Sequence, residues 1–338
     1  MTRPTILSTT PRGVVLPGYD RLRATLRKHE LRVLEPRTVE ALRAAIVEAD
    51  YVLGDWTGEL RLDRDTLAPA KRCRLVVQPT AGFDSIDVDF AQEIGLPVAN
   101  TPGANARGVA EWAVMAMLMT LKNAVLNHER TRRGEWRMVE AAEEGVFDLG
   151  GRTVGILGFG RTGREVARRV SAFGVARILY VQRSPDTPRF GHEVPVERVA
   201  DVDELCRRSD VLSIHVPLTP ATRHLIDGHR LKLLGPGAVL VNTSRGAVVD
   251  EDALHAALGN GELKAAALDV FSDEPLTGAH RWRELGNVML SPHLSGSTVE
   301  SRERMISGAL RSLDGALAGV LPESVVNGVG ALRVVASG

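Results

Sequence analysis

Three side chains of the sequence, Arg245, Glu274 and His293, are of the types needed to reduce a ketone that carries a neighbouring carboxylate. Hydride addition to such a carbonyl develops negative charge on its oxygen and requires a proton donor. Histidine is the natural donor near neutral pH, and a carboxylate beside it orients the ring and favours the protonated form. Arginine pairs with a carboxylate and polarises a carbonyl. This chemistry suits the reversible reduction of a 2-oxo acid.

Each of the three residues lies in a polar segment that directly follows an apolar run: Asn242–Gly246, Asp269–Pro275 and Ser291–Gly296. In an open α/β sheet the carboxyl ends of the strands surround the ligand crevice, so an Arg, a Glu and a His delivered there would meet over one substrate. An isolated Arg or Glu is more often a solvated surface residue, and an isolated His a packed one. Spacing alone leaves both interpretations open.

The elements that would position these residues are short apolar strands alternating with helical patterns, which is typical of parallel βαβ units and an α/β fold. A first series ends at the turn Thr101–Gly103, and a helix beginning near Asn105 leads to a second series that closes with a helix over 298–317. The predicted strands of the first series are Thr5–Ser8, Leu31–Leu34, Asp50–Gly54, Leu75–Gln78 and Pro97–Asn100, with helices over Tyr19–Lys28 and Val39–Glu48. Those of the second are Arg152–Leu157, Arg177–Val181, Val211–Val216, Ala238–Asn242, Ala265–Asp269 and Val288–Ser291.

The composition favours a two-domain protein of the cytoplasm. A chain of 338 residues exceeds the size at which single cores stop growing. Acidic and basic residues balance at 42 each, so no overall field attracts nucleic acid or an anionic membrane. Cys73 and Cys206 form neither a disulfide framework nor a metal-ligand spacing, which fits a reducing compartment and predicts no metal. The N-terminus has no signal-peptide pattern, and the most apolar stretch, Val109–Leu121, is too short to span a bilayer.

A glycine-rich loop, Gly158-Phe-Gly160-Arg-Thr-Gly163, lies between an apolar strand and a helical pattern. The first glycine permits the tight turn, the second lets the backbone approach a diphosphate, and the third allows close packing of helix on strand. The helix N-terminus offers its free amides and a partial positive charge to the phosphates. Glycine-rich turns also occur as turns only, but this context predicts dinucleotide binding.

The choice of dinucleotide depends on the residues some 20 positions further on, where NAD enzymes usually carry an acid for the ribose 2′-hydroxyl. Here the strand ends in Gln182, Arg183 and Ser184, with no acid. A cationic Arg183 beside the hydroxyl of Ser184 suits a 2′-phosphate, so we expect NADP(H) to be preferred over NAD(H). The alternative is that Arg183 is an ordinary solvent-exposed loop residue.

Between residues 78 and 327 the sequence resembles the D-isomer-specific 2-hydroxyacid dehydrogenase family. The motifs that carry the resemblance, in one order along the chain, are Ala81–Asp87, Val98–Gly103, the glycine loop, His215–Thr219 and the three polar segments. The resemblance implies two doubly wound parallel-sheet domains, with a Rossmann cofactor domain (residues 106–294) inserted in a flavodoxin-like substrate domain (1–105 and 295–338). It also implies a homodimer, with the helix around Glu111 at the interface.

The resemblance further implies a role for each matching residue. His293 would be the general acid/base and Glu274 its partner, while Arg245 and the amides of Ala81 and Gly82 would bind the substrate. The cofactor would contact a longer set: the backbone at Arg161 and Thr162 at its diphosphate, His215, Val216 and Pro217 around its adenosine, and Thr243, Asp269, His293 and Gly296 towards its nicotinamide.

Two departures from the family pattern bear on the substrate. Ala81 stands where relatives often have Val, and Gln78 precedes it, so the fit to substrate is expected to differ. Formate dehydrogenases of the superfamily carry Gln in place of Glu274, which argues against formate. Two alternatives remain: a non-enzymatic dinucleotide-sensing protein that resembles the superfamily's corepressors, and a phosphite-type dehydrogenase on the same scaffold.

Overall fold

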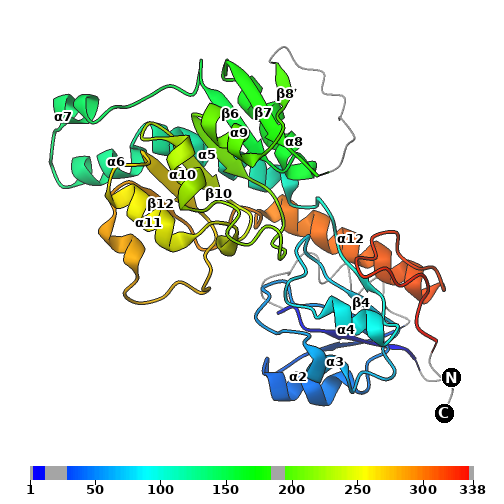
Figure 1. Ribbon diagram of the computed structural model, residues 1–338. Coiled ribbons are helices and arrows are strands. Elements are labelled where there is room, and N and C mark those ends of the chain that lie inside the picture. The colour runs from blue at the N-terminus through cyan, green and yellow to red at the C-terminus, as the bar shows by residue number, and fades with distance from the viewer. Residues whose placement is uncertain (1–2, 12–28, 184–194, 335–338) are drawn as a thin grey trace. The chain divides into compact units, whose positions relative to one another are not determined.

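The computed structural model describes residues 3–11, 29–183 and 195–334, so the helix predicted over 19–28 lies outside the described residues. The chain divides into two compact units. Unit 1 comprises Met1–Asn105 and Thr298–Gly338, and unit 2 comprises Ala106–Ser297. The chain therefore leaves unit 1 once, completes unit 2 and returns (Figure 1).

Unit 1 is built on a parallel five-stranded sheet in the order β2-β1-β3-β4-β5. Its strands are β1 (Thr5–Ser8), β2 (Glu30–Val33), β3 (Tyr51–Leu53), β4 (Leu75–Val77) and β5 (Val98–Ala99). Its helices are α2 (Val39–Ile46), α3 (Arg64–Leu67), α4 (Val88–Glu93) and α12 (Val299–Leu317).

Two separate apolar clusters show that both faces of this sheet are covered. Leu42 and Ile46 of α2 pack in one cluster with Val52 of β3. Leu313 of α12 packs in the other with Tyr51, the preceding residue of the same strand. Because successive side chains of a strand point to opposite faces, α2 and α12 lie on opposite sides of the sheet. A sheet buried on both faces explains why its strands are continuous apolar runs.

Unit 2 contains a parallel seven-stranded sheet in the order β12-β11-β10-β9-β6-β7-β8. Its strands are β6 (Thr153–Leu157), β7 (Arg177–Val181), β8 (Val196–Arg198), β9 (Val211–Ile214), β10 (Val239–Asn242), β11 (Ala265–Leu268) and β12 (Val288–Leu290). Its α-helices are α5 (Ala106–Leu121), α6 (Ala124–Arg132), α7 (Met138–Glu143), α8 (Arg161–Ser171), α9 (Val202–Arg208), α10 (Gly228–Leu234) and α11 (Glu251–Gly259), with 3-10 turns η2 (Gly246–Val248) and η3 (Arg281–Glu284).

The interior strand β10 contributes side chains to both apolar clusters of unit 2. Val239 and Val241 face the cluster that includes α5 and α8, whereas Leu240 faces the cluster that includes α9, α10 and α11. Helices on both faces of a parallel sheet, with the strand order reversing between β9 and β6, make a doubly wound fold. The expected α/β fold class is confirmed, and the predicted strands are found to within a few residues of their ends.

Sequence analysis missed β8, the edge strand Val196–Arg198, because it is short and its side chains are partly or fully exposed. It also missed the one- and two-turn helices α3, α4 and α7. Such elements carry too few apolar residues to produce a periodic pattern.

Among the described residues no single helix is long and apolar enough to cross a membrane. One pair of helices, α5 with α6, passes the length and composition test together but is bent by 63° at its break. Ten of the residues of α5 are buried within the protein, as expected for a core helix of unit 2.

Candidate active site

The three polar segments singled out in the sequence follow β10, β11 and β12, which are neighbours in the parallel sheet of unit 2. Parallel strands end at the same edge, so the structure brings Arg245, Glu274 and His293 to one edge of this unit. The proximity of Arg245 is also visible in its electrostatic effect on the Glu274 carboxyl.

His293 and Glu274 form a direct pair, with His293 Nδ1 at 2.7 Å from Glu274 Oε2. The other carboxylate oxygen accepts the backbone amide of Phe271 at 2.8 Å. Burial raises the pKa of the Glu274 carboxyl, but the hydrogen bond from His293, the amide of Phe271 and the charge of Arg245 outweigh this effect, so its pKa lies below the ordinary value. An ionised carboxylate can only accept, so Nδ1 carries a proton and Nε2 is left for proton exchange with a substrate.

Asp269 fixes the loop that carries His293. Its fully buried carboxylate accepts the amides of Leu294 at 2.8 Å and Ser295 at 2.9 Å, together with the hydroxyl of Ser291. Its carbonyl accepts the amide of His293 at 2.8 Å. His293 has a left-handed backbone, with φ 54°, which costs a non-glycine residue about 1–3 kcal/mol unless its surroundings enforce it. Both carboxylate oxygens of Asp269 hold the His293 loop, and its contact with the nicotinamide end, implied by the resemblance, stays a prediction.

Arg245 is half-buried and held by its own turn. Its Nη1 donates to the carbonyl of Ser244 at 2.7 Å, and Asn242 Nδ2 donates to the carbonyl of Arg245 at 2.9 Å. The next residue, Gly246, lies so close to the chain before Glu274 that an added Cβ would be 2.0 Å from the carbonyl carbon of Phe271. The Arg245 and Glu274 segments are therefore packed backbone to backbone.

His215, at the end of β9, is a different kind of histidine. Its Nε2 lies 2.8 Å from Ser213 Oγ, and its Nδ1 lies 3.4 Å from Thr243 Oγ1. Desolvation lowers its pKa to about 3, so the ring is neutral near neutral pH and is not suited to donate a proton there. Next to it, the carbonyl of Val216 accepts the hydroxyl of Ser244. These contacts make a rigid wall at the strand ends, and Ser213 is a part of it that the sequence pattern did not indicate.

The glycine loop has the geometry that a dinucleotide requires. Gly158 has φ 96°, and an added Cβ would lie 2.8 Å from the carbonyl of His215. At Gly163 a Cβ would lie 2.2 Å from the carbonyl of Gly158, whereas at Gly160 it would meet nothing within 4 Å. The first and third glycines are thus required by packing. The second leaves an open approach to the first amides of α8, which have no carbonyl partner inside the helix. The loop fits a diphosphate.

At the end of β7, Arg183 is exposed and the two described residues after the strand, Gln182 and Arg183, are not acidic, while Ser184 lies outside the described residues. Sequence analysis did not consider Arg198, which pairs with Tyr180 across β7 and β8 and donates to the carbonyl of Gln182 at 3.1 Å. Only the sheet register brings this second cation beside the end of β7. Two further predicted cofactor residues, Pro217 and Gly296, lie in the described strand-end loops. Among the described residues there is no group of His, Cys, Asp or Glu side chains that could hold a metal ion.

Ala81 and Gly82 lie in unit 1, half-buried in the loop that follows β4. They are therefore at a strand end as well, but of the other sheet. The predicted substrate-binding residues therefore fall into two groups, one in each unit.

Comparison with known proteins identifies the family. Residues 114–295 match the family model described as "D-isomer specific 2-hydroxyacid dehydrogenase, NAD binding domain". A glyoxylate reductase of Aeropyrum pernix is 41% identical over 300 residues, covering 87% of both chains. A hydroxypyruvate reductase of Thermotoga maritima is 37% identical over 283 residues, covering 83% of this chain and 89% of the relative. The D-mandelate dehydrogenase of Rhodotorula graminis superposes with a TM-score of 0.89 at 26% identity, covering 98% of this chain and all of that one.

The chain belongs to the D-isomer specific 2-hydroxyacid dehydrogenase family. The expected class of reaction, nicotinamide-dependent hydride transfer between a 2-oxo acid and a D-2-hydroxy acid, is confirmed at that level.

The glycine loop yields a paired prediction. Gly160→Ala should leave the melting temperature unchanged, because the new Cβ meets open space, but should weaken dinucleotide binding about tenfold or more by blocking the diphosphate. Gly163→Ala should lower the melting temperature, because its Cβ overlaps the carbonyl of Gly158. Thermal unfolding and cofactor titration measure the two effects. Unchanged cofactor affinity in Gly160→Ala would contradict the assignment of this loop.

Proposed function

We propose that the chain is a 2-oxo acid reductase that prefers NADPH, with His293 as general acid/base, Glu274 as its partner and Arg245 as the substrate-binding cation. The observation that carries the proposal is the 2.7 Å contact between His293 Nδ1 and Glu274 Oε2, at the strand edge that also presents Arg245. Reduction of a 2-oxo acid forms an alkoxide next to a carboxylate. The imidazole can protonate the alkoxide, and the arginine can stabilise the negative charge.

Before reduction, Glu274 stabilises the positive charge of the protonated His293 ring. During reduction, His293 Nε2 gives its proton to the carbonyl oxygen and the ring becomes neutral. Arg245 offsets the charge that develops on the oxygen and pairs with the carboxylate. The amides of Ala81 and Gly82 bind that carboxylate from unit 1. When bound, the nicotinamide supplies the hydride that adds to the carbonyl carbon. Glyoxylate and hydroxypyruvate are the first substrates to test, since the relatives named above act on them.

The cofactor contacts proposed from unit 2 follow the strand ends. Arg161 and Thr162 hold the diphosphate with their amides, His215, Val216 and Pro217 line the adenosine side, and Thr243 and Gly296 lie towards the nicotinamide with His293. Asp269 serves that end through the His293 loop it holds. We also propose a cytoplasmic location, which is supported by two buried, unpaired cysteines.

Replacing the acid/base tests the function directly. His293→Ala should lower kcat for 2-oxo acid reduction by about 10²–10⁴-fold with cofactor affinity retained, because the proton donor is lost but the glycine loop is not. Steady-state assays with glyoxylate, hydroxypyruvate, pyruvate and bulkier oxo acids, each with NADH and NADPH, measure it.

A suitable control is His255→Ala, because His255 belongs to α11, where its partners among the described residues are the carbonyl of Arg281, the ring of Trp282 and the charge of Asp252. It should keep wild-type turnover. Wild-type turnover in His293→Ala would show that the acid/base assignment is wrong. A wild-type protein that binds dinucleotide but reduces no oxo acid would favour the sensor alternative, and turnover of phosphite alone would favour the phosphite alternative.

The cofactor preference is tested at the end of β7. Arg183→Ala should raise the KM for NADPH about tenfold or more and leave that for NADH nearly unchanged, because only NADPH carries the 2′-phosphate. Arg177→Ala provides a matched control, since Arg177 is an exposed arginine at the opposite end of the same strand. Equal effects of Arg183→Ala on both cofactors would defeat the proposal.

We propose a homodimer whose interface includes the helix around Glu111 (α5), as the resemblance implies, together with α6, α7 and the segment that joins them. Neither α6 nor α7 buries any of its residues within the chain, and both lie at the margin of unit 2 (Figure 1). The exposed apolar side chains there include Trp136, Met138 and Val139, which are 82%, 67% and 59% exposed. An apolar surface of this kind marks an association site, and a second copy fits the homodimer implied by the family resemblance.

Trp136→Glu with Met138→Glu should convert the dimer to a monomer, because two buried charges would face an apolar interface. Light scattering coupled to size exclusion measures the mass. Val320→Glu, at an exposed apolar residue of unit 1, should leave the dimer intact. A wild-type monomer, or a dimer that survives the double substitution, would rule out this interface.

A further inference from the structure

The loop after β4, residues 79–83, turns all the carbonyls of four consecutive residues into the body of unit 1. Each carbonyl accepts a hydrogen bond from a side chain or amide of this loop or of the segment after β5. Thr101 donates from Oγ1 to the carbonyl of Pro79 at 2.8 Å and from its backbone amide to the carbonyl of Thr80 at 3.2 Å. Asn100 Nδ2 donates to the carbonyl of Ala81, and Thr80 Oγ1 donates to the carbonyl of Gly82, each at 2.7 Å. These bonds fix the orientation of the four peptides whose carbonyls belong to residues 79–82.

This orientation determines where the amides point. In a trans peptide the carbonyl of one residue and the amide of the next point in opposite directions, so inward carbonyls at Thr80, Ala81 and Gly82 turn the amides of Ala81, Gly82 and Phe83 outward. None of these three amides donates to another residue in the described part of the chain, and all three residues are half-exposed. Successive free amides on one side of a turn form a concave anion-binding surface.

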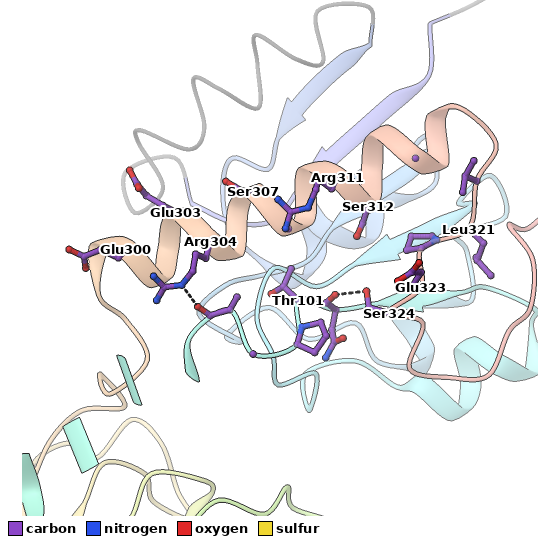
Figure 2. A pocket seen from close by; sticks show the side chains of 18 residues that line it. Thr101, Glu300, Glu303, Arg304, Ser307, Arg311, Ser312, Leu321, Glu323 and Ser324 are labelled. Carbon is purple, nitrogen blue, oxygen red and sulfur yellow. Dashed lines mark hydrogen bonds between the residues drawn. The ribbon is translucent and has the colours of Figure 1, made fainter. Parts of the chain in front are cut away.

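The residues that hold the carbonyls are themselves held. Asn100 forms two hydrogen bonds with Ser324. The hydroxyl of Ser324 donates to the backbone carbonyl of Asn100 at 2.7 Å, and the backbone amide of Asn100 donates to the carbonyl of Ser324 at 3.2 Å. Thr101 packs against Gly308 of α12, where an added Cβ would lie 2.9 Å from Thr101 Cγ2. These residues line a groove of about 900 Å³ between α12, the segment after β5 and residues 320–324. Figure 2 shows Thr101 and Ser324 there.

The hydroxyl of Thr80 has a similar support on the other side. Gln78, which is 2% exposed, donates from Nε2 to Thr80 Oγ1 at 2.8 Å and to the carbonyl of Asp55 at 3.0 Å. Because the Thr80 oxygen already accepts this bond, its own proton is directed to the carbonyl of Gly82. Gln78, noted above as a departure from the family pattern, is thus part of the support of the loop.

We propose that Asn100, Thr101 and Thr80 are positioning residues that aim the amides of Ala81, Gly82 and Phe83 at the carboxylate of the substrate. The proposal rests on the proposed function, because it assigns these amides to a 2-oxo acid. The three residues act through the loop and do not touch the substrate. Their removal should therefore weaken carboxylate binding, with little change in the rate of the bound substrate.

Asn100→Ala tests this inference with oxalate, the smallest carboxylate analogue of a 2-oxo acid. Binding is measured by calorimetry on the full-length protein saturated with its nicotinamide cofactor. The Kd for oxalate should rise about three- to tenfold, the range that corresponds to one lost hydrogen bond. The KM for the oxo acid should rise by the same factor, with kcat and cofactor affinity retained.

Asn327→Ala is the matched control. Asn327 is also a buried asparagine of unit 1; it accepts the amide of Val98 at 3.1 Å and donates to the carbonyl of Leu96 at 2.8 Å, without touching the loop. Its replacement should lower the melting temperature as Asn100→Ala does, but keep wild-type oxalate affinity. An equal loss of affinity in both variants would reduce Asn100 to a structural residue and overturn the inference.

A conservative pair at Thr101 separates the hydrogen bond from packing. Thr101→Val keeps a methyl against Gly308 but loses the donor to Pro79, so it should weaken oxalate binding. Thr101→Ser keeps the donor and should bind oxalate as wild type does. The reverse ranking, or a wild-type protein that does not bind oxalate, would overturn the inference. Absence of oxo acid turnover by the wild type, with the oxalate ranking intact, would instead contradict the proposed function.

Discussion

The buried carboxylate of Asp269 is the constraint on which the candidate site of unit 2 depends. It accepts two successive backbone amides and a hydroxyl from the loop after β12, and its own carbonyl holds the amide of His293. A buried charge is costly unless it is fully hydrogen-bonded, and here the loop supplies the bonds. The loop in turn accepts a left-handed backbone at His293. The stabilisation of one charge thus enforces the strained conformation that aims the imidazole at Glu274.

The two histidines at this sheet edge show how surroundings divide residues of one type between two tasks. His293 remains exposed and pairs with an ionised carboxylate, so it can exchange a proton with a substrate. His215 is bonded to two hydroxyls and desolvated, so it stays neutral and serves only as a wall. Both follow apolar strands in the sequence. Proximity to a strand end therefore predicts access to the crevice, whereas the neighbouring groups decide whether a histidine there has a carboxylate partner, as His293 has, or is desolvated, as His215 is.

The parts of the fold that could be predicted from the sequence are those with an apolar pattern: the strands of both sheets apart from β8, with α2, α5 and α12. The glycine loop and the three polar segments could be found because each follows such a strand. The function of Asp269 could not be predicted, because its partners are backbone amides some 25 residues away and amides have no signature in a sequence. Arg198 and Ser213 depend on strand register and on a side-chain rotamer, and these follow from packing of the whole sheet.

The loop after β4 is a second place where backbone groups with no sequence signature are proposed to act, in this case by binding the substrate carboxylate. Its anion-binding groups are proposed to be backbone amides, which are present in every residue and carry no titratable proton. What is specific to this chain is the set of side chains that turn the carbonyls away, Asn100, Thr101 and Thr80. A surface made of oriented amides binds a carboxylate without the desolvation cost of a second buried cation and without the entropy of a long side chain. In the proposal made above, the direction of the peptides, and so the binding of the carboxylate, depends on residues behind the loop. The sequence of the loop itself predicts a carboxylate site there, but it does not indicate the side chains that orient the amides.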